Sequence, residues 1–152
     1  MSPAVPMSTD VAGQVLSIAE SWIGTPYRHQ GATKGVGCDC LGLIRGIWRT
    51  LYGCEPELPP AYARDWAEHG GEDRLMQAAL RHFGPSRDFD QAAPGDLILF
   101  RWRPDCAAKH AGILDHAGHF IHAYEQAAVV RSALVPSWRR RVAATFRFPL
   151  SA

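Results

Sequence analysis

The sequence lacks an excess of charge of one sign. Its 152 residues contain 16 Lys and Arg against 15 Asp and Glu, which gives a formal net charge of +1. A balance so near neutrality creates little long-range attraction for a nucleic-acid backbone or for anionic lipid. We therefore expect no nucleic acid and no acidic membrane surface among the partners.

Long hydrophobic runs are also missing. The longest apolar runs are fragments such as Leu97–Phe100, whereas a membrane-spanning helix needs about 20 apolar residues. Met1–Asp10 lacks the basic-then-apolar order of a secretory signal peptide. These absences predict no membrane insertion and synthesis in the cytoplasm without a signal peptide.

Cysteine is scarce, with four residues: Cys38, Cys40, Cys54 and Cys106. In a chain without a leader these are better interpreted as thiols than as the disulfide framework of a small secreted domain. A reduced cysteine acts as a nucleophile or as a metal ligand. Seven histidines accompany the cysteines, and four of them lie between residues 110 and 122. Imidazole is therefore available for either chemistry.

The composition and the periodicity of the chain predict its fold. With 47% hydrophobic and 20% charged residues, residues 1–152 are expected to form one globular domain. Helical spacing predicts helices over residues 11–23, from Cys40 to about Gly53, and over Asp73–Phe83. Strand-like runs follow Pro94, at residues 97–100, 111–114, 119–123, 129–132 and 142–148. The expected fold is α+β, with N-terminal helices packed on a C-terminal antiparallel β-sheet.

Two segments rich in turn residues connect these elements. Gly24–Asp39 contains repeated glycines and is expected to be a loop that turns tightly or approaches a ligand closely. Cys54–Ala63 contains three prolines and is expected to be an irregular surface excursion.

Cys40 stands where the glycine-rich loop meets the second helix, directly after Asp39, a candidate N-cap. At a helix start a thiol faces unpaired backbone N–H groups and the positive end of the helix dipole, which lower its pKa. Cys40 is therefore a candidate nucleophile. The alternative is that Cys40 is simply a small buried residue.

A base is expected from the predicted hairpin that follows. The loop 116–118 fits a three-residue turn of type I followed by Gly118 in the left-handed conformation. In that register Gly112 lies opposite His122, so His110 and His122 share one face as diagonal neighbours. A slip of one residue would place them on opposite faces. The pattern predicts Cys40 as nucleophile, His110 as base and His122 as the group that orients the base.

Five blocks of sequence resemble the NlpC/P60 cysteine peptidases. They are Thr25-Pro26-Tyr27, Gly37-Cys38-Asp39-Cys40-Leu41-Gly42-Leu43, Pro94-Gly95-Asp96-Leu97-Ile98-Leu99-Phe100, His110-Ala111-Gly112-Ile113 and Phe120-Ile121-His122-Ala123. The resemblance implies a papain-like fold, no cofactor, and hydrolysis of amide bonds in peptidoglycan stem peptides, typically between D-γ-glutamate and diaminopimelate. It implies the same roles for Cys40, His110 and His122. It also implies that Asp39 contacts the free amino group of the substrate, and that Tyr27 helps near the oxyanion or the substrate.

One further segment resembles a particular branch of that family. Glu57–Tyr62 with Asp65–Glu68 is similar to the phage and gene-transfer-agent members, which are associated with tails. This resemblance implies tail proteins as partners and action in the periplasm or cell wall from a virion or tail. The sequence also departs from the family: His29-Gln30 replaces the usual Trp-Gly after Tyr27-Arg28, and Leu41 replaces the serine that commonly follows the cysteine. Both departures concern the expected substrate groove.

Two rival interpretations remain open. Cys38, Cys40, Cys106 and His110 carry the ligand types of a tetrahedral zinc site, although Cys-x-Cys is tighter than the usual spacing. The same fold also serves a non-hydrolytic tail or binding module, or a thiol acyltransferase. Fold alone does not determine function.

Overall fold

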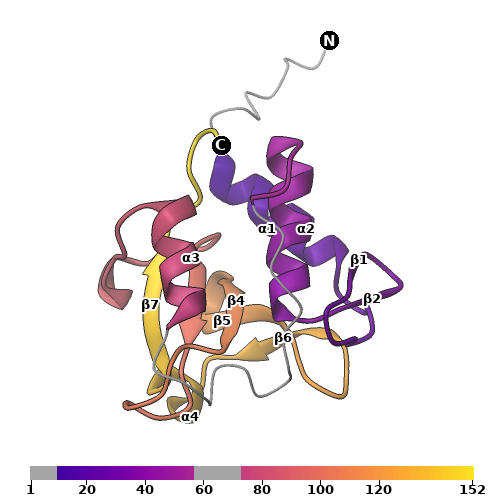
Figure 1. Ribbon diagram of the computed structural model, residues 1–152. Helices are drawn as coiled ribbons and strands as arrows, with labels where there is room; N and C mark the ends of the chain where they lie inside the picture. The colour runs from indigo at the N-terminus through magenta and orange to yellow at the C-terminus, as the bar shows by residue number, and fades with distance from the viewer. Residues whose placement is uncertain (1–9, 57–72) are drawn as a thin grey trace.

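The computed structural model of this protein describes residues 10–56 and 73–152 (Figure 1). The helices are α1 (Val11–Ser21), α2 (Cys40–Tyr52), α3 (Arg74–Phe83) and α4 (Pro136–Arg139). The strands are β1 (Ala32–Thr33), β2 (Gly37–Cys38), β3 (Leu97–Phe100), β4 (His110–Leu114), β5 (His119–Ala123), β6 (Val129–Ala133) and β7 (Val142–Phe146). The tail-like segments at 57–62 and 65–68, and most of the predicted excursion 54–63, lie outside the described residues.

The five longer strands form one antiparallel sheet in the order β6-β5-β4-β3-β7. Helix α2 packs on β4 and β5, with α1 beside it (Figure 1). The predicted α+β fold, with helices on an antiparallel sheet and α2 against it, is therefore confirmed.

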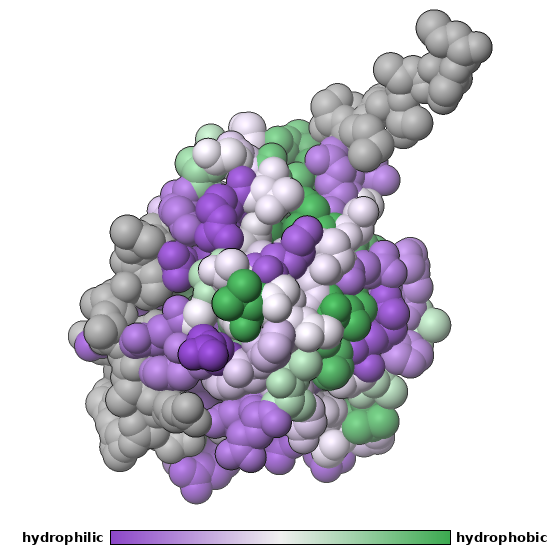
Figure 2. Space-filling view, turned by 90° about the vertical axis from the view of Figure 1, so that its right-hand side faces the viewer, coloured by the Kyte–Doolittle hydropathy of each residue, from purple (hydrophilic) through white to green (hydrophobic). Residues whose placement is uncertain are grey.

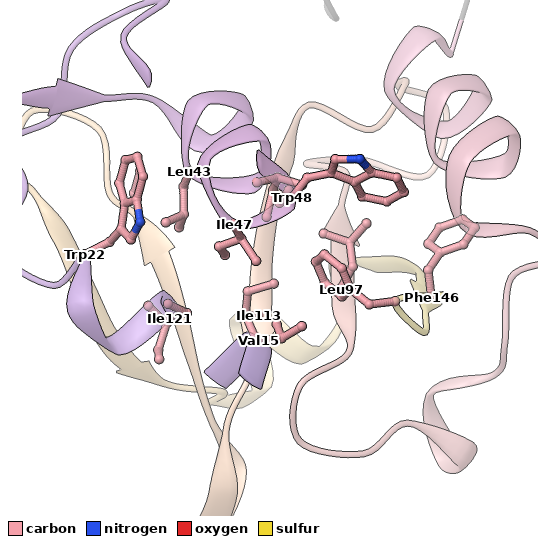
Figure 3. Close-up of a cluster of buried hydrophobic side chains, with 14 of the residues drawn as sticks. Val15, Trp22, Leu43, Ile47, Trp48, Leu97, Ile113, Ile121 and Phe146 are labelled. Carbon is pink, nitrogen blue, oxygen red and sulfur yellow. The ribbon is translucent and has the colours of Figure 1, made fainter. Parts of the chain in front are cut away.

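The main core lies between the helices and the sheet (Figure 3). Ile47 of α2 and Val15 of α1 meet Ile113 and Ile121 of the sheet there, and all four are completely buried. Burying side chains of this size stabilises a fold by roughly 1.5–3 kcal/mol each. A smaller cluster on other strand positions contains Ile98, Phe100, Leu114 and Phe120.

The contact between α1 and α2 depends on a glycine. A Cβ atom at Gly46 would lie 2.1 Å from the ring of Trp22, so glycine at this position lets the indole approach α2 this closely. Helix α1 ends at Ser21, two residues earlier than predicted, and Ile23 is exposed beyond it. Asp10 is the N-cap of α1, since its Oδ1 accepts from the backbone N–H of Gly13 at 2.9 Å.

The hairpin β4–β5 has the predicted register, with Ile113 opposite Ile121 and Leu114 opposite Phe120. The predicted turn type is wrong at one residue. Ala117 has φ 57° and ψ 34°, so it is left-handed together with Gly118 instead of right-handed before it. The pairing register of β4 and β5 is nevertheless the predicted one. The loop has the predicted length, and loop length determines which residues pair.

Three further details differ from the sequence-based expectation. The loop Gly24–Asp39 contains the short pair β1–β2, joined at Ala32–Cys38 and Thr33–Gly37. Strand β7 ends at Phe146, two residues before the predicted end. The short helix α4 was not predicted, although Pro136 stands at its first position, where a missing N–H costs nothing.

The coloured surface in Figure 2 shows small hydrophobic groups separated by hydrophilic residues. Among the described residues, no helix combines the length and the apolar character needed to cross a membrane.

Candidate active site

The glycine-rich loop is held against the first turn of α2 by Asp39. Its Oδ1 accepts from the N–H of Gly42 and its Oδ2 from the N–H of Gln30, both at 2.8 Å. A Cβ at Gly42 would lie 1.7 Å from the carbonyl oxygen of Gly31, so the two main chains are in direct contact. Asp39 is therefore the predicted N-cap, and its buried carboxylate also fixes the loop.

Cys40 is the first residue of α2 and is half-buried. Its thiol donates to the carbonyl oxygen of Lys109, at an Sγ–O distance of 3.8 Å. The backbone N–H groups of Ala111 and Leu41 also face the sulfur. The sulfur consequently lies against the start of β4, immediately beside His110.

The predicted acidity of this thiol is wrong. Burial, followed by the adjacent Asp39 carboxylate, raises the pKa of Cys40 from 9.0 to about 12, and the facing N–H groups of Ala111 and Leu41 lower it less than these raise it. Position at a helix start favours the thiolate, but removal from water disfavours a charged sulfur more strongly. The combined effect favours the neutral thiol over the thiolate.

His110 and His122 form a close imidazole pair. His110 Nε2 and His122 Nδ1 are 2.8 Å apart, and the ring planes are nearly perpendicular at 82°. Gly112 of β4 lies against His122, since a Cβ at this position would lie 3.2 Å from the Cβ of His122. The structure thus brings together the two histidines that the hairpin register predicted.

Sequence reasoning missed Ser132, whose Oγ lies 2.9 Å from His122 Nε2. Ser132 is on the edge strand β6, opposite Phe120 and therefore diagonal to His122. No motif marks this serine. Only the register of β6 on β5, which depends on a tertiary pairing, brings its hydroxyl to the imidazole.

Aromatic rings surround the pair. Trp102 stacks on His110 at a centroid distance of 5.8 Å, and Trp138 lies 5.6 Å from His110 and 5.2 Å from His122. Burial, with smaller effects from His122 and Lys109, lowers the pKa of His110 to about 3. Burial also lowers the pKa of His122 to about 4. Both imidazoles are neutral near neutral pH, as a base must be before it accepts a proton.

One cavity of about 120 Å³ is lined by four of the five predicted site residues. Cys40, His110, Tyr27 and Asp39 line it, together with Trp102, Trp138 and others, whereas His122 lies behind His110. Tyr27 is positioned by its backbone, because its N–H donates to the carbonyl of Ala127 and it bridges to Cys38. His29 and Leu41, two of the residues that depart from the family pattern, line the same cavity.

The zinc alternative gains no support from the placement of its ligands. Cys38 is completely buried in the main core, and burial raises its pKa to about 12, which opposes the thiolate that zinc requires. Within residues 10–56 and 73–152, no group of three His, Cys, Asp or Glu side chains is arranged to hold a metal ion.

A cysteine at the start of a central helix, beside histidines on an antiparallel sheet, defines a papain-like domain. Residues 24–147 match the sequence profile of the NlpC/P60 family. The chain belongs to this family.

Individual relatives are similar over much of this chain. The probable endopeptidase NlpC of Escherichia coli K12 is 33% identical over 115 residues, covering 76% of this chain and 63% of that protein. The gamma-DL-glutamyl hydrolase of Bacillus subtilis is 31% identical over 146 residues, covering 95% and 31%. The murein DD-endopeptidase MepS/murein LD-carboxypeptidase of E. coli K12 is 29% identical over 135 residues, covering 88% and 61%. The chain therefore spans less than two thirds of these relatives.

Solved structures agree on the fold. The NlpC/p60 domain of the peptidoglycan hydrolase SagA has a TM-score of 0.63 at 20% identity, covering 90% of this chain and 98% of that chain. NlpC2 from Trichomonas vaginalis has a TM-score of 0.61 at 18% identity, covering 91% and 46%.

Proposed function

We propose that this protein is a cysteine endopeptidase that hydrolyses amide bonds in peptidoglycan stem peptides. The observation that carries the proposal is that the Cys40 thiol and the His110 imidazole line one cavity, with His110 Nε2 held by His122. The names of the relatives, an endopeptidase, a gamma-DL-glutamyl hydrolase and a murein endopeptidase, support the substrate class.

The reaction takes two steps. Because Nε2 of His110 is engaged with His122, Nδ1 of His110 takes the thiol proton while the sulfur attacks the amide carbonyl. The C–N bond then breaks, and His110 returns the proton to the leaving amine. His110 next takes a proton from water, whose oxygen attacks the thioester carbonyl. The C–S bond then breaks, and His110 returns that proton to the departing sulfur, so the thiol is restored. The acid product leaves as a carboxylate after it gives its own proton to solvent. The backbone N–H of Cys40, which has no acceptor within its helix, donates to the developing oxyanion, with Tyr27 beside it.

In this mechanism the Cys40 thiol and the His110 imidazole are uncharged before the reaction, and charge develops on them only as the proton moves. Burial raises the pKa of Cys40 and lowers the pKa of His110, and both shifts favour the uncharged forms, so in this mechanism proton transfer accompanies attack on the bound substrate. A preformed thiolate–imidazolium pair is not part of this mechanism.

The bond between D-γ-glutamate and diaminopimelate is the proposed cleavage point, with Asp39 toward the free amino group of the stem. Two relatives are named for the cleavage of different bonds: one is a gamma-DL-glutamyl hydrolase and the other a murein DD-endopeptidase. Digestion of purified peptidoglycan followed by mass analysis separates the alternatives, because each bond leaves different fragments. Cys40→Ala should produce no fragments. Cys54→Ala, which removes an exposed thiol, is the matched control and should digest like wild type.

The acyltransferase alternative differs in the final acceptor. In water enriched in ¹⁸O, a hydrolase places the heavy oxygen in the new carboxylate, whereas a transferase places an amine there. Unchanged peptidoglycan after incubation with wild type would refute the peptidase and favour a binding module.

We also propose that a phage-like tail delivers the protein, because residues 57–62 and 65–68 resemble the phage and gene-transfer-agent members of the family. The partners would be tail proteins, and the site of action the periplasm or cell wall. Co-purification of the protein with tail particles, detected by mass spectrometry, tests it. Intact particles without the protein would refute it.

A further inference from the structure

A buried imidazole pair has two proton arrangements, and they differ in what they allow His110 to do. In the first, His110 Nε2–H donates to His122 Nδ1, which leaves His110 Nδ1 bare. In the second, His122 Nδ1–H donates to His110 Nε2, so His110 carries its proton on Nδ1. Only the first arrangement can accept a thiol proton at Nδ1.

The choice between the two depends on the far nitrogen of His122. In the first arrangement His122 Nε2 carries a proton and needs an acceptor. His122 is completely buried, with the Phe120 ring 4.2 Å from its own and Trp138 across it. The Ser132 Oγ lies 2.9 Å from Nε2 and supplies that acceptor.

Removal of the hydroxyl affects the two arrangements unequally. A buried N–H donor without an acceptor costs the full desolvation of that group. Among backbone groups, folded proteins tolerate an unsatisfied acceptor somewhat more often than an orphaned donor, and we apply the same order to a bare ring nitrogen and a ring N–H. Loss of Ser132 Oγ therefore shifts His122 toward the arrangement that blocks the base.

We infer that Ser132 is a positioning residue that fixes His122 as the Nε2–H tautomer and so keeps His110 Nδ1 available to the Cys40 thiol. Ser132, His122 and His110 form a three-member relay across β6, β5 and β4. The inference rests on the proposed peptidase function for its effect on rate, but its effect on the tautomer is independent of any substrate.

The test uses Ser132→Thr and Ser132→Val, which have nearly the same shape and both suit an edge strand, but only threonine keeps the hydroxyl. In two-bond ¹H–¹⁵N spectra of ¹⁵N-histidine-labelled protein, wild type and Ser132→Thr should show His122 protonated on Nε2. Ser132→Val should show loss of that tautomer. Ser17→Ala, on the exposed face of α1, is the control and should match wild type.

In the digestion assay, Ser132→Val should lower kcat roughly tenfold with KM unchanged, and Ser132→Thr should restore it. Wild-type His122 protonated on Nδ1 would overturn the inference, as would an unchanged tautomer in Ser132→Val. If no variant digests peptidoglycan but the tautomer follows the hydroxyl as described, the proposed function fails and the relay stands. Thermal melts of the two variants show that any difference does not come from unfolding.

Discussion

Acid is expected to destabilise this protein through His110 and His122. Both imidazoles are buried, and burial lowers the pKa of His110 to about 3 and of His122 to about 4 from the ordinary 6.5. The unfolded chain therefore binds more protons than the folded one in the range between these values. The stability that the neutral imidazoles contribute is fully present above pH 6.5, and it is lost as the pH falls from there toward the folded-state values.

The size of the loss follows from the same values. Lowering the pH from about 8 to about 5 reduces the free energy of unfolding by about 2 kcal/mol for each imidazole, or by about 4 kcal/mol for the two together. This is a large share of the roughly 5–15 kcal/mol that a domain of this kind possesses. Asp115 and Glu55 do not add to the loss of stability between about pH 8 and about pH 5. Burial acts to raise the pKa of each carboxyl, but the arginine partners lower it overall.

Urea unfolding at several pH values measures this dependence. Wild type should lose about 4 kcal/mol of unfolding free energy between about pH 8 and about pH 5. A double variant with His110→Gln and His122→Gln should lose much less, while His116→Gln, on the exposed turn, should behave like wild type. A wild-type loss below about 1 kcal/mol, or an equal loss in the double variant, would refute the reasoning.

Three other predictions concern the site. Cys40→Ala and His110→Ala should each abolish digestion without loss of cooperative melting. His122→Ala should reduce digestion less, because this change removes the group that orients the base and not the base itself. Equal loss of digestion in all three variants would contradict this order. Because burial and Asp39 raise the pKa of Cys40 to about 12, its alkylation rate, followed by mass spectrometry, should keep rising with pH beyond 9.0, whereas a plateau near neutrality would indicate a preformed ion pair. Asp39→Ala should cost about 1 kcal/mol or more in chemical unfolding, since it removes the acceptor of two backbone N–H groups; Asp39→Asn should retain part of that stability, and equal losses would argue against capping.

Much of the fold follows from local pattern. The three longer helices and the β4–β5 register were predictable because periodicity and loop length act over a few neighbouring residues. The turn at Ala117 was predicted wrongly, since both conformations close a loop of the same length. The β1–β2 pair could not be predicted, because strands of two residues carry no period.

The sequence predicted which residues the structure brings together at the candidate site, but not their electrostatics. Cys40, His110 and His122 stand in recognisable blocks, and the register brought the histidines together. The acidity of Cys40 was predicted wrongly because sequence reveals a helix start but not the degree of burial. Ser132 was missed because its role arises only where β6 pairs with β5.

The contact between Gly42 and the Gly31 carbonyl limits where the Cys40 sulfur can lie. Where two main chains touch, no change of rotamer can absorb an added methyl group, so any larger residue at position 42 must displace the entire segment that carries Gln30 and Asp39. The location of the Cys40 sulfur is therefore coupled to the shape of the cavity wall. Redesign of specificity has more freedom at Leu41 and His29, whose side chains line the cavity without separating these backbones.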